Sequence, residues 1–79
     1  YRPKGIALAA DGRLFVSDSY LGVVQVFDRS GRFLRVLGDA GKVRRWNTPV
    51  GLAVDGRGRL LVTEMLPGTV SITELEALQ

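Results

Sequence analysis

Short apolar runs alternate with glycine-containing turns along most of the chain, and this pattern predicts consecutive β-strands joined in hairpins. The dipeptide Asp11-Gly12 is a strong turn signal, because glycine tolerates the positive φ that tight turns use. The predicted strands cover residues 5–9, 13–17, 23–27, 32–37, 51–55, 59–63 and 69–73. The chain is therefore predicted to be an all-β protein.

The fourth predicted strand is followed by a segment of a different kind. Alternation places Phe33, Arg35 and Leu37 on one face of the strand 32–37, and the two residues between them on the other. Residues 38–48 are mostly polar, which predicts a long loop.

A sequence repeat organises the chain. A shift of 46 positions aligns residues 3–27 with residues 49–73 without a gap, and nine of the 25 aligned positions are identical. Other pairs are conservative, such as Asp18 and Glu64. The identical pairs are Pro3/Pro49, Gly5/Gly51, Ala7/Ala53, Gly12/Gly58, Arg13/Arg59, Leu14/Leu60, Val16/Val62, Gly22/Gly68 and Val24/Val70. So many matches in one order indicate two copies of a structural unit.

Four short antiparallel strands in about 40–45 residues are typical of one β-propeller blade. Residues 1–47 are predicted to form a blade with four strands and the loop to the next blade, and residues 48–79 a second, incomplete blade with three strands and a tail. A blade is apolar on both faces and needs a neighbour on each side. Seven strands would also suffice for a free-standing sandwich, but a sandwich would not require the gapless repeat.

Two blades are too few for a closed propeller, which typically has about 4–8. We favour the interpretation that the chain is a segment of a longer protein. Alternatively, copies assemble into a ring, and three copies would supply six blades. Many closed propellers complete the last blade with a strand from the other end of the chain, which would suit Gln79 as a true carboxyl terminus.

Five segments show a pattern that is specific in its spacing. They are Pro3-Lys4-Gly5-Ile6-Ala7, Asp11-Gly12-Arg13-Leu14-Phe15-Val16-Ser17-Asp18-Ser19, Val24-Gln25-Val26-Phe27-Asp28, Gly31-Arg32-Phe33-Leu34-Arg35-Val36-Leu37-Gly38 and Trp46-Asn47-Thr48-Pro49-Val50-Gly51-Leu52-Ala53-Val54-Asp55. These segments resemble the NHL-repeat family of six-bladed β-propellers. The gluconolactonase-like and strictosidine-synthase-like propellers share much of the pattern. The resemblance implies a scaffold that binds proteins, although some such propellers bind RNA or line enzyme sites.

Composition excludes several kinds of site. The chain has no Cys and no His, so it offers no disulfide framework, no recognisable zinc site and no histidine-based nucleophilic triad. Its glycines form no phosphate-binding loop motif. Its uncharged runs are far shorter than the ~20 apolar residues of a membrane-spanning helix. We therefore expect no catalytic residue, no metal, no cofactor and no membrane span.

In a propeller, the loop after the fourth strand and the turns after each second strand share the face around the channel entrance. Arg, aromatic and Met side chains are frequent in protein-binding patches. This face combines three cations with aromatic and apolar side chains. We call these residues the candidate binding surface: Tyr20, Leu21, Lys42, Arg44, Arg45, Met65 and Leu66. A protein partner is expected there, and an ordinary solvated loop is the alternative.

Three other residues are interpreted as structural. Asp18 and Glu64 end the second strand of each unit, and two carboxylates are too few ligands for Ca²⁺. Each is instead predicted to accept backbone N–H groups of the following turn. Trp46 precedes Asn47-Thr48-Pro49, where the family resemblance implies a residue that packs between blades.

The leading hypothesis is a non-catalytic protein-interaction module. An RNA-binding propeller is the second, because residues 1–47 have nine basic and four acidic residues, a net charge of +5, whereas residues 48–79 have two and four, a net charge of −2. A third is a blade pair of a six-bladed hydrolase or lyase whose metal ligands lie in other blades. Further blades, from the same chain or from copies of it, are expected partners in each case.

Overall fold

The computed structural model describes residues 3–39, 42–66 and 68–75, and within these residues it contains no α-helix. Its strands are β1 (Pro3–Leu8), β2 (Leu14–Asp18), β3 (Val23–Phe27), β4 (Phe33–Val36), β5 (Gly38–Asp39), β6 (Lys42–Val43), β7 (Pro49–Val54), β8 (Arg59–Glu64) and β9 (Thr69–Glu74). The prediction of an all-β protein is confirmed, and each of the seven predicted strands is present within two residues of its expected ends. In the described part of the chain, no helix is long and apolar enough to cross a membrane.

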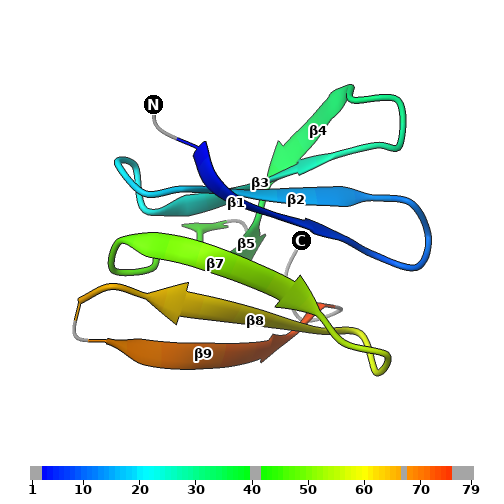
Figure 1. Cartoon of the computed structure of the whole chain (residues 1–79). Coiled ribbons are helices and arrows are strands. Elements are labelled where there is room, and N and C mark those ends of the chain that lie inside the picture. The colour runs from blue at the N-terminus through cyan, green and yellow to red at the C-terminus, as the bar shows by residue number, and fades with distance from the viewer. Residues whose placement is uncertain (1–2, 40–41, 67, 76–79) are drawn as a thin grey trace.

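The strands form two antiparallel meanders (Figure 1). The first sheet has the strand order β1-β2-β3-β4 and the second sheet the order β7-β8-β9. The two sheets share an irregularity, because the register of the first strand pair shifts between Pro3 and Gly5 in one sheet and between Pro49 and Gly51 in the other. The predicted tail of the second unit begins after residue 73; Glu74 is the last residue of β9, and residues 76–79 lie outside the described residues.

The segment predicted to be a loop contains a short hairpin. β5 and β6 pair antiparallel, with Gly38 opposite Val43, and the N–H of Arg44 donates to the carbonyl oxygen of Leu37 at 3.0 Å. The expectation of a loop without strands over residues 38–48 was therefore wrong. Leu37 and Gly38 are buried, and a buried backbone needs hydrogen-bond partners whatever the polarity of the side chains around it.

The alternation predicted for the fourth strand is broken by a bulge. Arg35 pairs with Val26, but Phe33 pairs with Phe27, so Leu34 is an extra residue on β4. Phe33 and Arg35 therefore lie on opposite faces, and the expectation that they share one was wrong. The ring of Phe33 instead contacts that of Phe27 edge to face, with 5.7 Å between the ring centroids.

Each sheet has two faces, because successive side chains of a strand point to opposite sides. Face A of the first sheet carries Gly5, Ala7, Phe15, Ser17, Val24 and Val26, and face A of the second sheet carries the residues 46 positions later. Face B of the first sheet carries Ile6, Leu8, Leu14 and Val16, and face B of the second sheet carries Leu52, Val54, Leu60 and Val62.

Face A of the first sheet packs on face B of the second, with β1 and β7 side by side (Figure 1). Phe15, Val24 and Val26 share one buried cluster with Leu60 and Val62. Burial of such side chains is the main favourable contribution to folding. The core of the molecule is therefore the contact between its two repeats.

Candidate binding site

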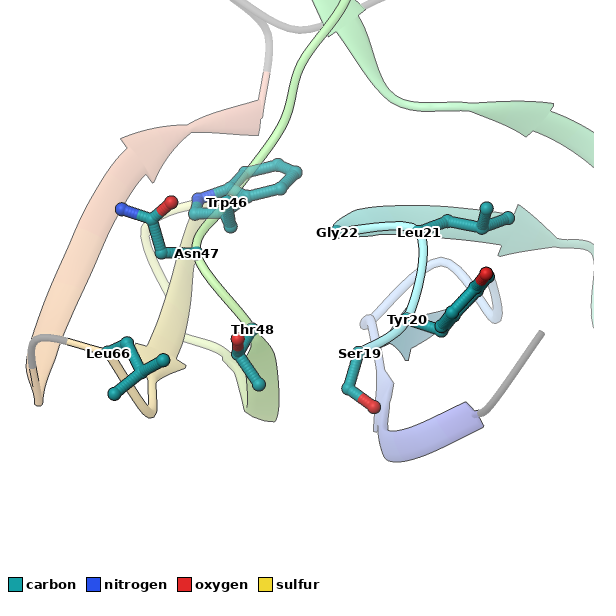
Figure 2. A pocket seen from close by; sticks show the side chains of 8 residues that line it. All are labelled: Ser19, Tyr20, Leu21, Gly22, Trp46, Asn47, Thr48 and Leu66. Atoms are coloured by element: carbon teal, nitrogen blue, oxygen red, sulfur yellow. The ribbon is translucent and has the colours of Figure 1, made fainter.

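A pocket of about 540 Å³ opens where the two sheets meet, at the end of β2 and the start of β7 (Figure 2). Its lining residues are Ser19, Tyr20, Leu21, Gly22, Trp46, Asn47, Thr48 and Leu66. In Figure 2, Tyr20 and Leu21 lie on one side, in the turn after β2, and Leu66 lies on the other, in the turn after β8. Trp46, Asn47 and Thr48 come from the segment that enters β7. Both repeats and their connection therefore contribute to this pocket.

The turn after β2 is shaped by Asp18. Its Oδ1 accepts the N–H groups of Tyr20 at 3.0 Å and Leu21 at 2.9 Å, and its carbonyl oxygen accepts the N–H of Gly22 at 2.9 Å. The prediction that Asp18 accepts backbone N–H groups of the following turn is confirmed. The Asp18 side chain is buried, so the turn that presents Tyr20 and Leu21 is anchored from inside the fold.

The backbone of Gly22 touches the segment that carries Trp46. Gly22 has a φ of +74°, and a Cβ on it would lie 2.7 Å from the carbonyl oxygen of Trp46. The N–H of Trp46 donates to the carbonyl oxygen of Gly22 at 2.8 Å. Glycine is needed here both for its backbone conformation and for this close approach.

Trp46 lies between the two sheets. Its side chain is buried in the shared core, and its indole N–H donates to Oγ of Ser71 on β9 at 3.4 Å. The guanidinium of Arg44 stacks over the indole, 5.0 Å from the ring centroid. The prediction that Trp46 is a packing residue is confirmed, and Trp46 is also among the residues that line the pocket.

The other side of the pocket is held by contacts to β8. The N–H of Met65 donates to the carbonyl oxygen of Thr48 at 3.0 Å, and Thr48 has a φ of +49°. The carbonyl oxygen of Glu64 accepts the N–H of Gly68 in the following turn at 3.0 Å, but the carboxylate was also expected to accept N–H groups of that turn, as that of Asp18 does, and this was wrong. The Glu64 Oε2 instead accepts the N–H of Asn47 at 2.7 Å, because the longer side chain of Glu64 reaches across to the segment that enters β7.

The candidate binding surface is only partly gathered at the pocket. Tyr20, Leu21 and Leu66 line it. Arg45 adjoins it, because its guanidinium donates to the carbonyl oxygen of Leu21 at 2.7 Å. The remaining members are placed differently: Arg44 lies over Trp46, Met65 is exposed beside Leu66, and Lys42 is exposed on β6 and does not line the pocket.

Five of the lining residues were not predicted to belong to the site: Ser19, Gly22, Trp46, Asn47 and Thr48. The signal for Gly22 was available, because it follows Leu21 in a turn already assigned to this end of the sheet. Nothing in the sequence pattern marks Thr48, since a positive φ at a β-branched residue runs against its local preference. Its conformation follows from the tertiary contact with Met65.

A smaller pocket of about 210 Å³ lies at the opposite end of the sheets, among the hairpin turns that follow β1 and β7. Asp11 and Asp55 line it. The backbone N–H of Arg13 lowers the pKa of Asp11, and the backbone N–H of Arg59 lowers the pKa of Asp55. Each carboxylate also forms an ion pair with that same arginine, so both are ionised turn residues rather than proton donors.

Among the described residues, no three His, Cys, Asp or Glu side chains are grouped so that they could hold a metal ion. A comparison with protein-family models found no match to this chain, and a comparison with curated proteins found no significant match either. The repeat and the geometry of the sheets and the pocket are therefore the observations from which the function of this chain is inferred.

Proposed function

We propose that the chain forms two blades of an NHL-type β-propeller and acts as a non-catalytic protein-interaction module. The blade assignment is supported by the gapless 46-residue repeat and by the register shift that both sheets share at their first strand pair. It is also supported by the stacking of face A on face B, since neighbouring blades of a propeller cover each other in this way.

The observation that carries the binding proposal is the group of exposed apolar side chains around the larger pocket. Tyr20 is 74% exposed, Met65 60% and Leu66 65%, and all three lie in the turns that follow the second strand of each sheet. Single exposed apolar residues are ordinary. Several of them beside one pocket are typical of an interaction site, because such a patch gains free energy when a partner covers it.

The charges around the pocket favour a partner with acidic groups. Arg44 and Arg45 flank the apolar residues, and Lys42 precedes them on β6. The carboxylates of Asp18 and Glu64, at the ends of β2 and β8, accept backbone N–H groups. An apolar centre with a charged rim is the usual anatomy of a protein interface. We infer that the partner is a peptide segment in which an aromatic or aliphatic side chain is flanked by Asp or Glu.

Selection from a displayed library of short random peptides tests this function. Selected peptides are expected to combine acidic and apolar residues. The substitutions Tyr20→Ala and Leu66→Ala are each expected to weaken their binding by about thirtyfold, which corresponds to roughly 2 kcal/mol for an anchor residue. Val43→Ala is the matched control, because Val43 is 50% exposed on β6 and does not line the pocket. Peptides that bind all three variants as tightly as the wild type would exclude this surface as the site.

RNA binding is the second candidate, and the observation that favours it is the net charge of +5 on residues 1–47. Phosphate contacts release counterions, so an affinity due to them falls steeply as salt rises. A filter-binding titration with a short single-stranded RNA of mixed sequence, repeated at several salt concentrations, distinguishes the two functions. Binding that weakens steeply with salt and is lost in Arg45→Ala would favour RNA, whereas no binding at low salt would eliminate it.

A further inference from the structure

Equivalent positions of face A differ in burial between the two sheets. Val24 and Val26 are fully buried in the first sheet, where the second sheet covers them. The residues 46 positions later, Val70 and Ile72, are each 57% exposed on the second sheet. The repeat thus retains an apolar face A in the second sheet, although no part of the described chain covers it.

Face B shows the same difference in the opposite direction. Leu60 and Val62 of the second sheet are buried, and Leu52 packs against the same core. On the first sheet, face B is open along β1, where Ile6 is 64% and Leu8 67% exposed, while the equivalents of Leu60 and Val62, which are Leu14 and Val16, are half-buried. The chain therefore has one A–B contact inside it, an unused face A at one end and an unused face B at the other.

The polar groups at the internal contact are also repeated on the open face A. In the first sheet, Oγ of Ser17 accepts the N–H of Gly5 at 2.9 Å and donates to the carbonyl oxygen of Val50 on the second sheet. A Cβ on Gly5 would collide with that carbonyl oxygen. In the second sheet, Oγ1 of Thr63 accepts the N–H of Gly51 at 2.7 Å, but Thr63 is exposed. The hydroxyl and the glycine that receive a neighbouring strand are therefore present on the open face too.

We propose that copies of this chain associate head to tail, with face A of the second sheet in one copy packed on face B of the first sheet in the next. A second copy is the occupant that the structure supports, because among the described residues face A of the first sheet is covered by face B of the second sheet, and another copy offers the equivalent face B. In the resulting contact, Thr63 Oγ1 donates to the carbonyl oxygen of Lys4 in the next copy, since Lys4 is 46 positions before Val50.

This contact joins two different faces, so each new copy again presents one open face A and one open face B. Such a head-to-tail interface stops growing only when a ring closes. Propellers close with about 4–8 blades, so a chain with two sheets is expected to close as two, three or four copies. Closure also leaves no apolar face exposed to solvent.

Sedimentation equilibrium of the purified chain and three variants tests the proposal. The wild type is expected to have a mass of two, three or four times 8.6 kDa. Ile72→Lys blocks face A and Leu8→Lys blocks face B, and both side chains are exposed, so neither change disturbs the core. Each variant is expected to have the monomer mass. Val43→Lys, an exposed apolar residue on neither face, is the control and is expected to keep the wild-type mass.

An equimolar mixture of Ile72→Lys and Leu8→Lys is the decisive sample. The first variant retains face B and the second retains face A, so the mixture is expected to form a dimer of one chain of each, although neither associates alone. A wild type that is monomeric at all concentrations overturns the proposal, as does association that both lysine variants retain or a mixture that stays monomeric. The result does not depend on the pocket, because Tyr20→Ala and Leu66→Ala alter neither face; a loss of peptide binding with intact assembly would contradict only the proposed function.

Discussion

Aspartate side chains determine the geometry of the hairpin turns. Oδ1 of Asp28 accepts the N–H groups of Ser30 and Arg32, both at 2.9 Å, and Oδ1 of Asp55 accepts those of Arg57 and Arg59, also at 2.9 Å. Both turns have the sequence Asp-x-x-Gly-Arg, with the glycine at positive φ. One carboxylate thus satisfies two backbone donors that the turn leaves without a strand partner.

Acidification is expected to destabilise the fold through these turns. The pKa of Asp28 is lowered mainly by the hydroxyl of Ser30, and those of Asp11 and Asp55 mainly by the backbone N–H groups of Arg13 and Arg59. A carboxylate whose pKa is lower in the folded state stabilises it above the unfolded-state pKa, about 3.9 for Asp. This stabilisation is lost as the pH falls from above that value through the lower folded-state pKa.

Urea denaturation at fixed chain concentration, followed by circular dichroism over this pH range, measures the effect. The triple variant Asp11→Asn, Asp28→Asn, Asp55→Asn is the control, because it cannot titrate at these positions. Its urea midpoint is expected to depend less on pH than that of the wild type. Equal pH dependence in the two proteins would contradict this account of the turns.

A single methyl group at Gly5 is expected to disturb the contact between the sheets. A Cβ there meets the backbone oxygen of Val50, which cannot move aside as a flexible side chain can. Gly5→Ala is therefore expected to destabilise the fold by about 1–3 kcal/mol, the usual cost of overpacking. Gly56→Ala is the matched control, because a Cβ at Gly56 meets nothing within 4 Å and its φ is not positive. Urea denaturation of both variants checks this, and a Gly5→Ala variant as stable as Gly56→Ala would contradict the packing described here.

Individual strands were predictable because their signals are local. The run Val23–Phe27 became β3 with its predicted bounds, since apolar side chains and flanking turn residues specify such a strand without tertiary information. The bulge at Leu34 was not predictable, because it depends on the pairing of β4 with Phe27 rather than on the sequence of β4 itself. The hairpin of β5 and β6 was not predictable either, because backbone pairing forms it within a mostly polar segment.

For the candidate site, the sequence predicted the contribution of the two turns better than that of the segment that connects the two sheets. Tyr20, Leu21 and Leu66 meet at one pocket because the repeat places their two turns at the same end of each sheet. Asp18 and Glu64 show the limit of this reasoning. They occupy equivalent places in the repeat, yet the carboxylate of Asp18 caps its own turn, whereas the longer side chain of Glu64 reaches Asn47.

The segment that connects the two sheets depends on Trp46. Trp46 is 5% exposed and belongs to the core shared by both sheets. Trp46→Ala is expected to cost about 3–5 kcal/mol, as is usual for a large buried aromatic residue. Trp46→Phe keeps an aromatic ring in the core and loses only the indole N–H bond to Ser71, so it is expected to be much less harmful.

Urea denaturation followed by far-ultraviolet circular dichroism compares these two variants, since the tryptophan fluorescence is absent from both. Equal stability of Trp46→Ala and the wild type would show that the connection is not part of the core. A loss as large in Trp46→Phe as in Trp46→Ala would mean that the hydrogen bond to Ser71, rather than packing, is decisive.

The whole molecule is a stack of two similar sheets with an open apolar face at each end. Ile6 and Leu8 lie on one open face, and Val70 and Ile72 on the other. The sequence predicted these faces, because the repeat requires the same side chains in covered and uncovered positions. It could not predict what covers them, since that depends on contacts outside the chain.

The dependence of thermal stability on chain concentration tests the stacked-repeat account most directly. If the open faces are covered by other copies, association stabilises the folded state, and the midpoint of thermal unfolding rises with concentration. Circular dichroism over about a hundredfold range of concentration measures this. We expect a midpoint that increases steadily over that range for the wild type and remains constant for Ile72→Lys. A wild-type midpoint that is the same at every concentration would contradict the account.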